Sequence, residues 1–575
     1  MIQLLYVIAL LLCFTPLLPG LLGLLLPAIS WLPPLGYHSP DLTAFGLVSA
    51  WPGLSTSICL TLFTGIGSSW LALLFSFFIL RRYWDTSRWQ WLENTLSPML
   101  ALPHVAFAIG FAFLFSPSGW IYRLLEWVGI NTQQGLSIIQ DPYGIGLLLA
   151  LAIKETPFLL LMSIPVLQQL QTSRLNAVSA SLGYDHKQSW LRVVLPLLLP
   201  KLRLPLFAVA AYGLSVVDVA LIIGPSRPTT LAVLVWQWFN EPDLQQLPRA
   251  AVGALLLLTI TLVVLGGFRA IEWLLLSHHR RWLLKGALPR KGSQPAWFHQ
   301  LIPLYTPFIL LPILVVPILT VWSFAQRWRF PELFPSRFST RFWQQELEPL
   351  LQLSTNSILL ALISSAIALI LAIGCLEYRQ KHHRGLPNWL IAIPLVVPQL
   401  SLLFGVQVAT YLIPGQHYWL WVVWSHLFFV FPYLYLTLDG AWRSYDVRLD
   451  QCSRSLGMTG WQTWWQIKRP QVQPAILMGL AVGISVSLAQ YLSTQMLGAG
   501  RISTVTTEAV ALASGQDRRV TAIYGLLQGV LPFIFFSMAF VTNRLTTHYQ
   551  HHRHTTQQQR STHQDDTVCN KPHCK

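Results

Sequence analysis

The stretch SASLGYDHKQSWLRVVLPLLLP (residues 179–200) recurs 274 positions later as SRSLGMTGWQTWWQIKRPQVQP (residues 453–474). Both copies interrupt a chain that is otherwise strongly hydrophobic. The pairs of identical residues at matched offsets include Ser181/Ser455, Leu182/Leu456, Gly183/Gly457, Trp190/Trp464 and Pro196/Pro470. Agreement at rare residue types in one fixed register is improbable by chance, so the sequence predicts an internal duplication.

The composition places the chain in a lipid bilayer. Of its 575 residues, 53% are hydrophobic and only 10% are charged, whereas a soluble domain carries about 25% charged residues. The net charge of +16 could indicate a nucleic-acid partner. The Lys and Arg residues are scattered singly and in pairs between apolar runs, however, as expected of residues that orient membrane helices. We therefore expect a bilayer around the protein and no nucleic acid.

Twelve apolar runs are long enough to cross about 30 Å of hydrocarbon as helices. Lys154 and Glu155 interrupt the fourth run. The expected fold is an all-α, polytopic transmembrane helix bundle. The runs lie near residues 3–27, 56–80, 96–116, 143–167, 203–224, 250–276, 303–323, 355–376, 388–412, 417–438, 475–496 and 520–542.

The basic residues concentrate in alternate loops, which include both copies of the repeated segment. Because cytoplasmic loops carry an excess of Lys and Arg, we expect both termini and both copies on the cytoplasmic side. The predicted division is a first six-span half (1–277), a cytoplasmic linker (278–300), a second six-span half (301–545) and a disordered His-rich tail (546–575).

Each copy combines a polar, helix-compatible stretch with a glycine and a later Pro-x-x-x-Pro. Gly183 and Gly457 suit a helix C-terminus that needs a positive φ, and the prolines suit a break before the next span. We expect a short helix–turn–helix on the cytoplasmic surface that presents Trp, Gln and one or two basic residues.

This segment resembles the cytoplasmic "EAA" loop of ATP-binding-cassette (ABC) importer permeases, in which a glycine precedes a hydrophobic residue and a proline at fixed spacing. Here the spacing is met by Gly183 with Pro196 and by Gly457 with Pro470. The Glu-Ala-Ala positions themselves hold Ala177-Val178-Ser179 and Gln451-Cys452-Ser453. The two halves are similar to permease subunits of the iron(III), thiamine and polyamine type, fused into one chain.

The resemblance implies a type I importer permease in a bacterial inner membrane, which moves a small solute by alternating access. Its expected partners are a cytoplasmic dimer of ABC ATPase subunits and a solute-binding protein outside. The chain has no GxxxxGK[ST] phosphate loop, so we expect neither enzymatic activity nor a cofactor. The implied ATPase-docking residues are Ser181, Leu182, Gly183, Trp190, Pro196, Ser455, Leu456, Gly457, Trp464 and Pro470.

Three charged residues fall inside predicted spans, namely Lys154, Glu155 and Asp218. Intramembrane charges usually pair within the bundle or line a cavity, so they are candidates either for a structural ion pair or for the translocation pathway. We expect no metal site. The alternative function is an ion-coupled secondary transporter, which also has six-plus-six architecture. Such a carrier has no need of paired cytoplasmic docking loops.

Overall fold

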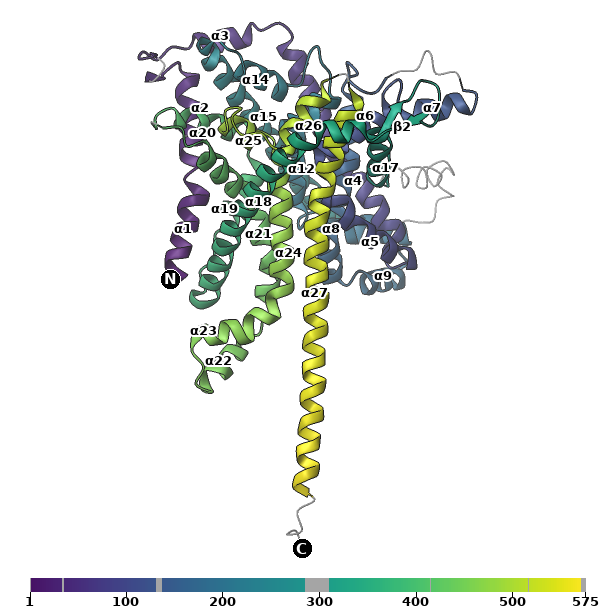
Figure 1. Ribbon diagram of the computed structural model, residues 1–575, viewed down its shortest axis with the longest axis vertical. Helices are drawn as coiled ribbons and strands as arrows, with labels where there is room; N and C mark the ends of the chain where they lie inside the picture. The colour runs from purple at the N-terminus through teal and green to yellow at the C-terminus, as the bar shows by residue number, and fades with distance from the viewer. Residues whose placement is uncertain are drawn as a thin grey trace.

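The computed structural model describes residues 2–33, 36–130, 137–284, 310–413, 415–515 and 517–569, without the side chains of 97, 98, 280, 282, 284 and 547–569. Helices dominate these ranges, and the chain forms an elongated bundle (Figure 1). The all-α, polytopic fold expected from the sequence is confirmed. The predicted linker 278–300 lies largely outside the described residues, as do the side chains of nearly all of the predicted tail.

The first part of the chain contains a series of long helices joined by short ones. Its elements are α1 (Ile2–Phe14), α2 (Leu17–Ala28), α3 (Thr43–Ser49), α4 (Leu54–Tyr83), α5 (Ser87–Ala101), α6 (His104–Phe115), α7 (Trp120–Trp127), α8 (Ile145–Leu170), α9 (Thr172–Ser181), α10 (His186–Ser189), the π-helix η2 (Trp190–Val194), α11 (Leu195–Leu198), α12 (Arg203–Ser215), α13 (Asp218–Ile223), α14 (Leu231–Phe239), the 3₁₀-helix η3 (Leu244–Gln246) and α15 (Leu247–Leu284).

The second part adds a small antiparallel hairpin, formed by β1 and β2. Its elements are α17 (Leu311–Phe324), β1 (Ala325–Arg327), β2 (Arg337–Phe338), α18 (Arg341–His382), α19 (Asn388–Val396), α20 (Gln399–Thr410), α21 (Tyr418–Ser444), α22 (Arg448–Ser455), α23 (Gly460–Thr463), the π-helix η4 (Trp464–Lys468), α24 (Arg469–Leu488), α25 (Leu492–Leu497), α26 (Val505–Ala513) and α27 (Arg518–Cys569).

Within the described ranges, nine helices are long and apolar enough to cross a membrane, or up to eleven if each of two sharply bent pairs forms one span. The predicted span near 303–323 corresponds to the shorter α17, and residues 301–309 lie outside the description. The exact number of twelve therefore stays a prediction. The bends were not expected. They measure 81° between 186–198 and 203–215, and 94° between α19 and α20.

The bend between α19 and α20 has a local cause. Pro398 follows the extended residue Val397, and a proline disfavours helical geometry in the residue before it. After the bend, α20 packs closely on α2 from the first part of the chain. A Cβ on Gly23 would lie 2.0 Å from the carbonyl oxygen of Gly405. Glycine at both positions therefore lets these two backbones approach, as small residues do between membrane helices.

Element bounds repeat at the spacing seen in the sequence. Residues 274 positions apart begin and end α10 and α23, η2 and η4, α13 and α25, and α14 and α26, and they begin α11 and α24. The fifth predicted span of each half is broken at the same place, at Val217 before α13 and at Tyr491 before α25. The two segments therefore share one order of helices, π-turns and breaks.

Candidate functional site

The repeated segment forms a helical hairpin in each copy, and the turn after its first helix is the same in both. We call residues 172–198 the first loop and residues 448–468 the second loop. In the first loop, Gly183 has φ +83°, its N–H donates to Ala180, and the N–H of Tyr184 donates to Ser179. This pair of bonds is a Schellman motif, which ends a helix with glycine in the left-handed region.

The second loop repeats this motif. Gly457 has φ +84°, its N–H donates to the carbonyl of Arg454, and the N–H of Met458 donates to that of Ser453. Open space surrounds the position of a Cβ on Gly457, so the positive φ, rather than crowding, requires glycine here. The turn that the sequence predicts at these glycines is present in both loops.

Each loop then starts its second helix with a polar cap. The Asp185 side chain accepts from the backbone N–H of His186. In the second loop, Thr459 and Gln462 form a reciprocal capping box, in which each side chain binds the other residue's backbone N–H. A cap of this type stabilises a helix start by about 1 kcal/mol. The spacing of Thr459 three residues before Gln462 is itself a sequence signature of such a cap.

The π-helical turns η2 and η4 precede Pro196 and Pro470 at the same distance. Proline has no N–H, so the carbonyl four residues earlier has no α-helical partner. In the first loop that carbonyl belongs to Arg192, and it accepts from His279 Nε2 of α15 at 2.6 Å. This contact ties the first loop to a span. Single π-turns often occur at functional sites.

The exposure of the ten expected docking residues divides them into three groups. Leu182 and Leu456, beside the turn glycines, are 67% and 83% exposed although both are large apolar side chains. Trp190 is only 1% exposed and packs against Phe77 at 6.3 Å between ring centroids. The expectation that the first loop presents this Trp is wrong, because the indole fills the core beneath the hairpin. The residues that share the exposed surface of Leu182 and Leu456 are Ser181, Gly183, Ser455 and Gly457, whereas Trp464, Pro196 and Pro470 are half-buried.

The three intramembrane charged residues are not all brought together. Glu155 Oε1 lies 2.8 Å from His104 Nε2, and Lys154 Nζ donates to the carbonyl of Met99 at 2.9 Å. Lys154 and Glu155 are both buried in α8. Asp218 is half-buried at the start of α13, after the break in its span. Neither partner, His104 or the Met99 carbonyl, was expected from the sequence, since no spacing links them to Glu155 or Lys154.

Comparison with known proteins decides the family. No model of a protein family matches the chain. The chain is 32% identical to "Inner membrane ABC transporter permease protein YnjC" of Escherichia coli (strain K12), over 528 residues that cover 91% of the chain and 93% of that protein. This chain belongs to the ABC transporter permeases. It is a multi-pass protein of the bacterial inner membrane and the transmembrane subunit of an ABC importer.

More distant relatives agree with this assignment. The permease is 25% identical over 478 residues to "Thiamine transport system permease protein ThiP" of Haemophilus influenzae, covering 77% of the chain and 80% of the relative. It is 23% identical over 211 residues to "Spermidine/putrescine transport system permease protein PotC" of Escherichia coli (strain K12), covering 35% and 74%. These relatives are transport subunits, and none supports the alternative of an ion-coupled carrier.

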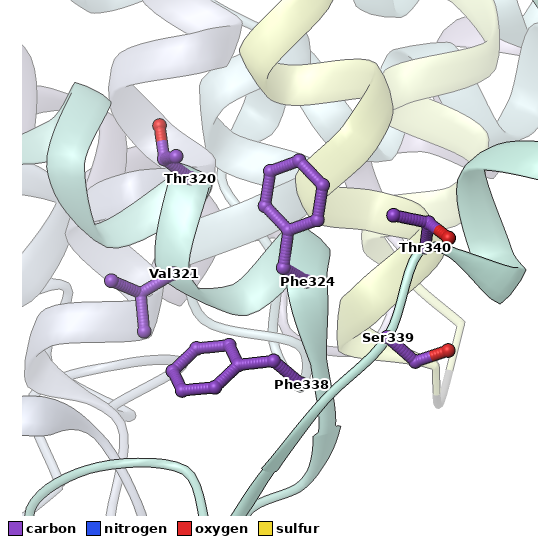
Figure 2. A pocket seen from close by; sticks show the side chains of 6 residues that line it. All are labelled: Thr320, Val321, Phe324, Phe338, Ser339 and Thr340. Atoms are coloured by element: carbon purple, nitrogen blue, oxygen red, sulfur yellow. The ribbon is translucent and has the colours of Figure 1, made fainter.

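A shallow pocket of about 580 Å³ lies at the junction of α17 with the β1–β2 hairpin (Figure 2). Phe324 and Phe338 provide its aromatic walls, and none of the expected site residues lines it. In Figure 1, β2 lies at the end of the ABC permease opposite α22 and α23, so this pocket is remote from the second loop. Among the described residues, no three His, Cys, Asp or Glu side chains gather where they could hold a metal ion.

Proposed function

We propose that the first and second loops are the sites at which two ATPase subunits dock on this importer permease. The observation that carries the proposal is the matched pair of Schellman turns, each presenting one exposed leucine beside its glycine. Exposed large apolar side chains at corresponding loop tips are typical of a surface that a partner covers. Leu182 and Leu456 would fill clefts in the ATPase subunits, which hydrolyse ATP on the cytoplasmic side.

The same proposal includes the organisation of the chain. Two six-span halves, 1–277 and 301–545, lie in parallel orientation with both termini in the cytoplasm, joined by the linker 278–300. The shared order of elements from α10 to α14 and from α23 to α26 supports this duplication. ATP binding would close the ATPase dimer and swing the halves between inward- and outward-facing states, because each state offers the nucleotide a different affinity.

We also propose that Lys154, Glu155 and Asp218 contribute to the translocation pathway. In discontinuous membrane helices, the breaks lie near the midplane and border substrate sites. Asp218 follows such a break, and the break at Tyr491 occupies the matched place in the other half. A solute-binding protein would deliver a small molecule from outside. The names of the relatives include both cations (spermidine, putrescine) and an anion (sulfate), so they do not select its charge.

Cys452 provides a native probe for this proposal, since it is exposed in the second loop. In a chain whose other cysteines are replaced by serine, a membrane-impermeant maleimide should label Cys452 in inside-out vesicles and not in right-side-out vesicles. Assembly with the ATPase should protect it. Leu244→Cys, on η3 and also exposed, is the matched control and should show the reverse sidedness and no protection. Labelling of Cys452 from outside, or equal labelling with and without the ATPase, would reject the docking assignment.

A further inference from the structure

A buried ion pair fixes the base of the second loop. Lys468, the last residue of η4, is only 1% exposed. Its Nζ lies 2.5 Å from Glu377 Oε1, near the end of α18, and also donates to the side-chain carbonyl of Gln380. The indole N–H of Trp442, near the end of α21, donates to the same Glu377 oxygen at 2.9 Å. One carboxylate thus joins the loop to two long helices.

Aromatic rings complete the enclosure of this ammonium group. Lys468 Nζ lies 5.7 Å from the ring centroid of Trp442 and 5.0 Å from that of Tyr445. A cation at these distances is attracted by the negative faces of the rings. Since a buried charge needs its partner, loss of either Lys468 or Glu377 alone leaves the other charge uncompensated.

The first half builds the same joint from apolar residues. The repeat aligns Lys468 with Val194, and the match of Ser57-Ile58 with Ser357-Ile358 aligns Glu377 with Phe77. Both Val194 and Phe77 are buried in one apolar cluster beneath the first loop, together with Trp190. The matched positions are therefore apolar in one half and form an ion pair in the other.

The first loop also has other attachments. Trp84 donates to Thr172 Oγ1 at 2.7 Å, His279 binds the carbonyl of Arg192, and α15 packs on η2. The second loop has less support, because α22 and α23 project beyond the bundle (Figure 1). From η4, the Lys468 side chain reaches α18 through its hydrogen bond to Gln380 and its ion pair with Glu377. This ion pair is thus a direct side-chain link from the second loop to α18, beside the covalent continuity of η4 with α24.

We propose that Lys468 and Glu377 are positioning residues that transmit movement of the second loop to α18 and α21. This inference rests on the proposed docking of the loops on ATPase subunits. In the second half the link from η4 to α18 would be electrostatic, whereas the matched positions of the first half, Val194 and Phe77, lie in an apolar cluster. Breaking the joint should leave the ATPase bound and active while the distant ends of the spans no longer respond to nucleotide.

The experiment uses the full permease with its co-purifying ATPase in lipid nanodiscs, with exposed cysteines replaced by serine. Spin labels are placed at Leu420→Cys, at the start of α21, and at Leu244→Cys, on η3 just before the end of α15 that is remote from the loops; both leucines are exposed. Double electron–electron resonance then measures the distance change caused by Mg-ATP with orthovanadate. We expect Lys468→Met and Glu377→Gln each to lose at least half of that change while ATPase co-purification stays within twofold of the parent.

Two further variants separate transmission from folding. The double variant Lys468→Val with Glu377→Phe installs the first-half pair and should restore the distance change. Asp439→Asn removes the Arg379–Asp439 ion pair, which joins α18 to α21 without touching the loop, and should leave the change intact. A full distance change in both single variants would overturn the proposal, and so would a double variant that assembles but does not recover.

The docking proposal fails in a distinguishable way. If it is wrong, Gly457→Asp, described below, will co-purify with the ATPase as well as the parent does. If only the joint is wrong, Gly457→Asp will lose the ATPase while Lys468→Met keeps both the ATPase and the distance change.

Discussion

Gly183 and Gly457 adopt the same left-handed conformation, with φ of +83° and +84°, although 274 residues separate them. A residue with a Cβ costs about 1–2 kcal/mol in this conformation, and a carboxylate also adds charge beside an exposed leucine. We expect Gly183→Asp or Gly457→Asp to abolish ATPase assembly and uptake while the chain still inserts in the membrane. Gly500→Asp is the control, because Gly500 has φ +70° and open space but lies outside both loops. Co-purification and membrane fractionation measure both effects. Equal losses in all three variants would point to general misfolding.

The exposed leucines should matter for binding rather than for stability. We expect Leu182→Asp and Leu456→Asp to weaken ATPase binding at least tenfold, because each removes an apolar contact and places a charge in the interface. Their melting temperatures in detergent should match the parent, since exposed substitutions usually change stability by less than about 0.5 kcal/mol. Leu244→Asp, on η3, replaces a leucine that is also exposed and should affect neither quantity. Unchanged ATPase affinity in both loop variants would contradict the assignment.

Stability of the first half should depend on Glu272. Arg203 at the start of α12 donates two hydrogen bonds of 2.7 Å to Glu272 of α15, which is 5% exposed. We expect Glu272→Gln to destabilise the protein by about 2 kcal/mol, as for the loss of hydrogen bonds between charged groups. The exposed pair of Arg448 with Asp446 is the comparison, and Asp446→Asn should not shift the melting temperature. Thermal unfolding followed by light scattering measures both.

A pH effect is expected at the entry to the second loop. Burial raises the pKa of Tyr445 above the ordinary value of about 10. The hydrogen bond that the Tyr445 hydroxyl donates to Asp450 at 2.5 Å raises it further. The folded protein therefore favours the protonated phenol. The contribution of this phenol to the free energy of unfolding is complete below pH 10 and is lost as the pH rises through the pKa of the folded state. The difference in phenolate absorbance between the parent and Tyr445→Phe reports on this phenol alone. It should show no titration up to pH 10. A transition below that pH would show that the phenol is not enclosed.

Asp218 provides a test of the proposed pathway. We expect Asp218→Asn to lower the rate of solute uptake by the assembled importer at least fivefold, while ATPase binding and melting temperature stay unchanged. The neutral amide keeps the size of the side chain and removes its charge. The opposite pattern, a lower melting temperature with normal uptake by the surviving protein, would show that Asp218 is structural.

Much of the fold follows from patterns within single segments. Apolar runs predict the helices, and the glycine before the Pro-x-x-x-Pro pattern predicts the turn at Gly457. The bend at Pro398 has a local signal, but its 94° angle depends on how α20 packs against α2. The burial of Trp190 could not be predicted, because it depends on Phe77 more than a hundred residues away. The pairing of Lys468 with Glu377 is likewise tertiary, and so is that of Glu155 with His104.

The π-turns η2 and η4 bear on the history of the chain. A π-turn accommodates one residue more than the regular helix around it, and each of these turns ends two residues before its proline. If both halves descend from one ancestral gene, that extra residue was present before the gene was doubled, since two independent insertions would rarely fall at the same site. The ancestor would then have worked as a pair of identical subunits with two equivalent joints. The Lys–Glu pair in one half would record how fusion allowed the two arms to diverge.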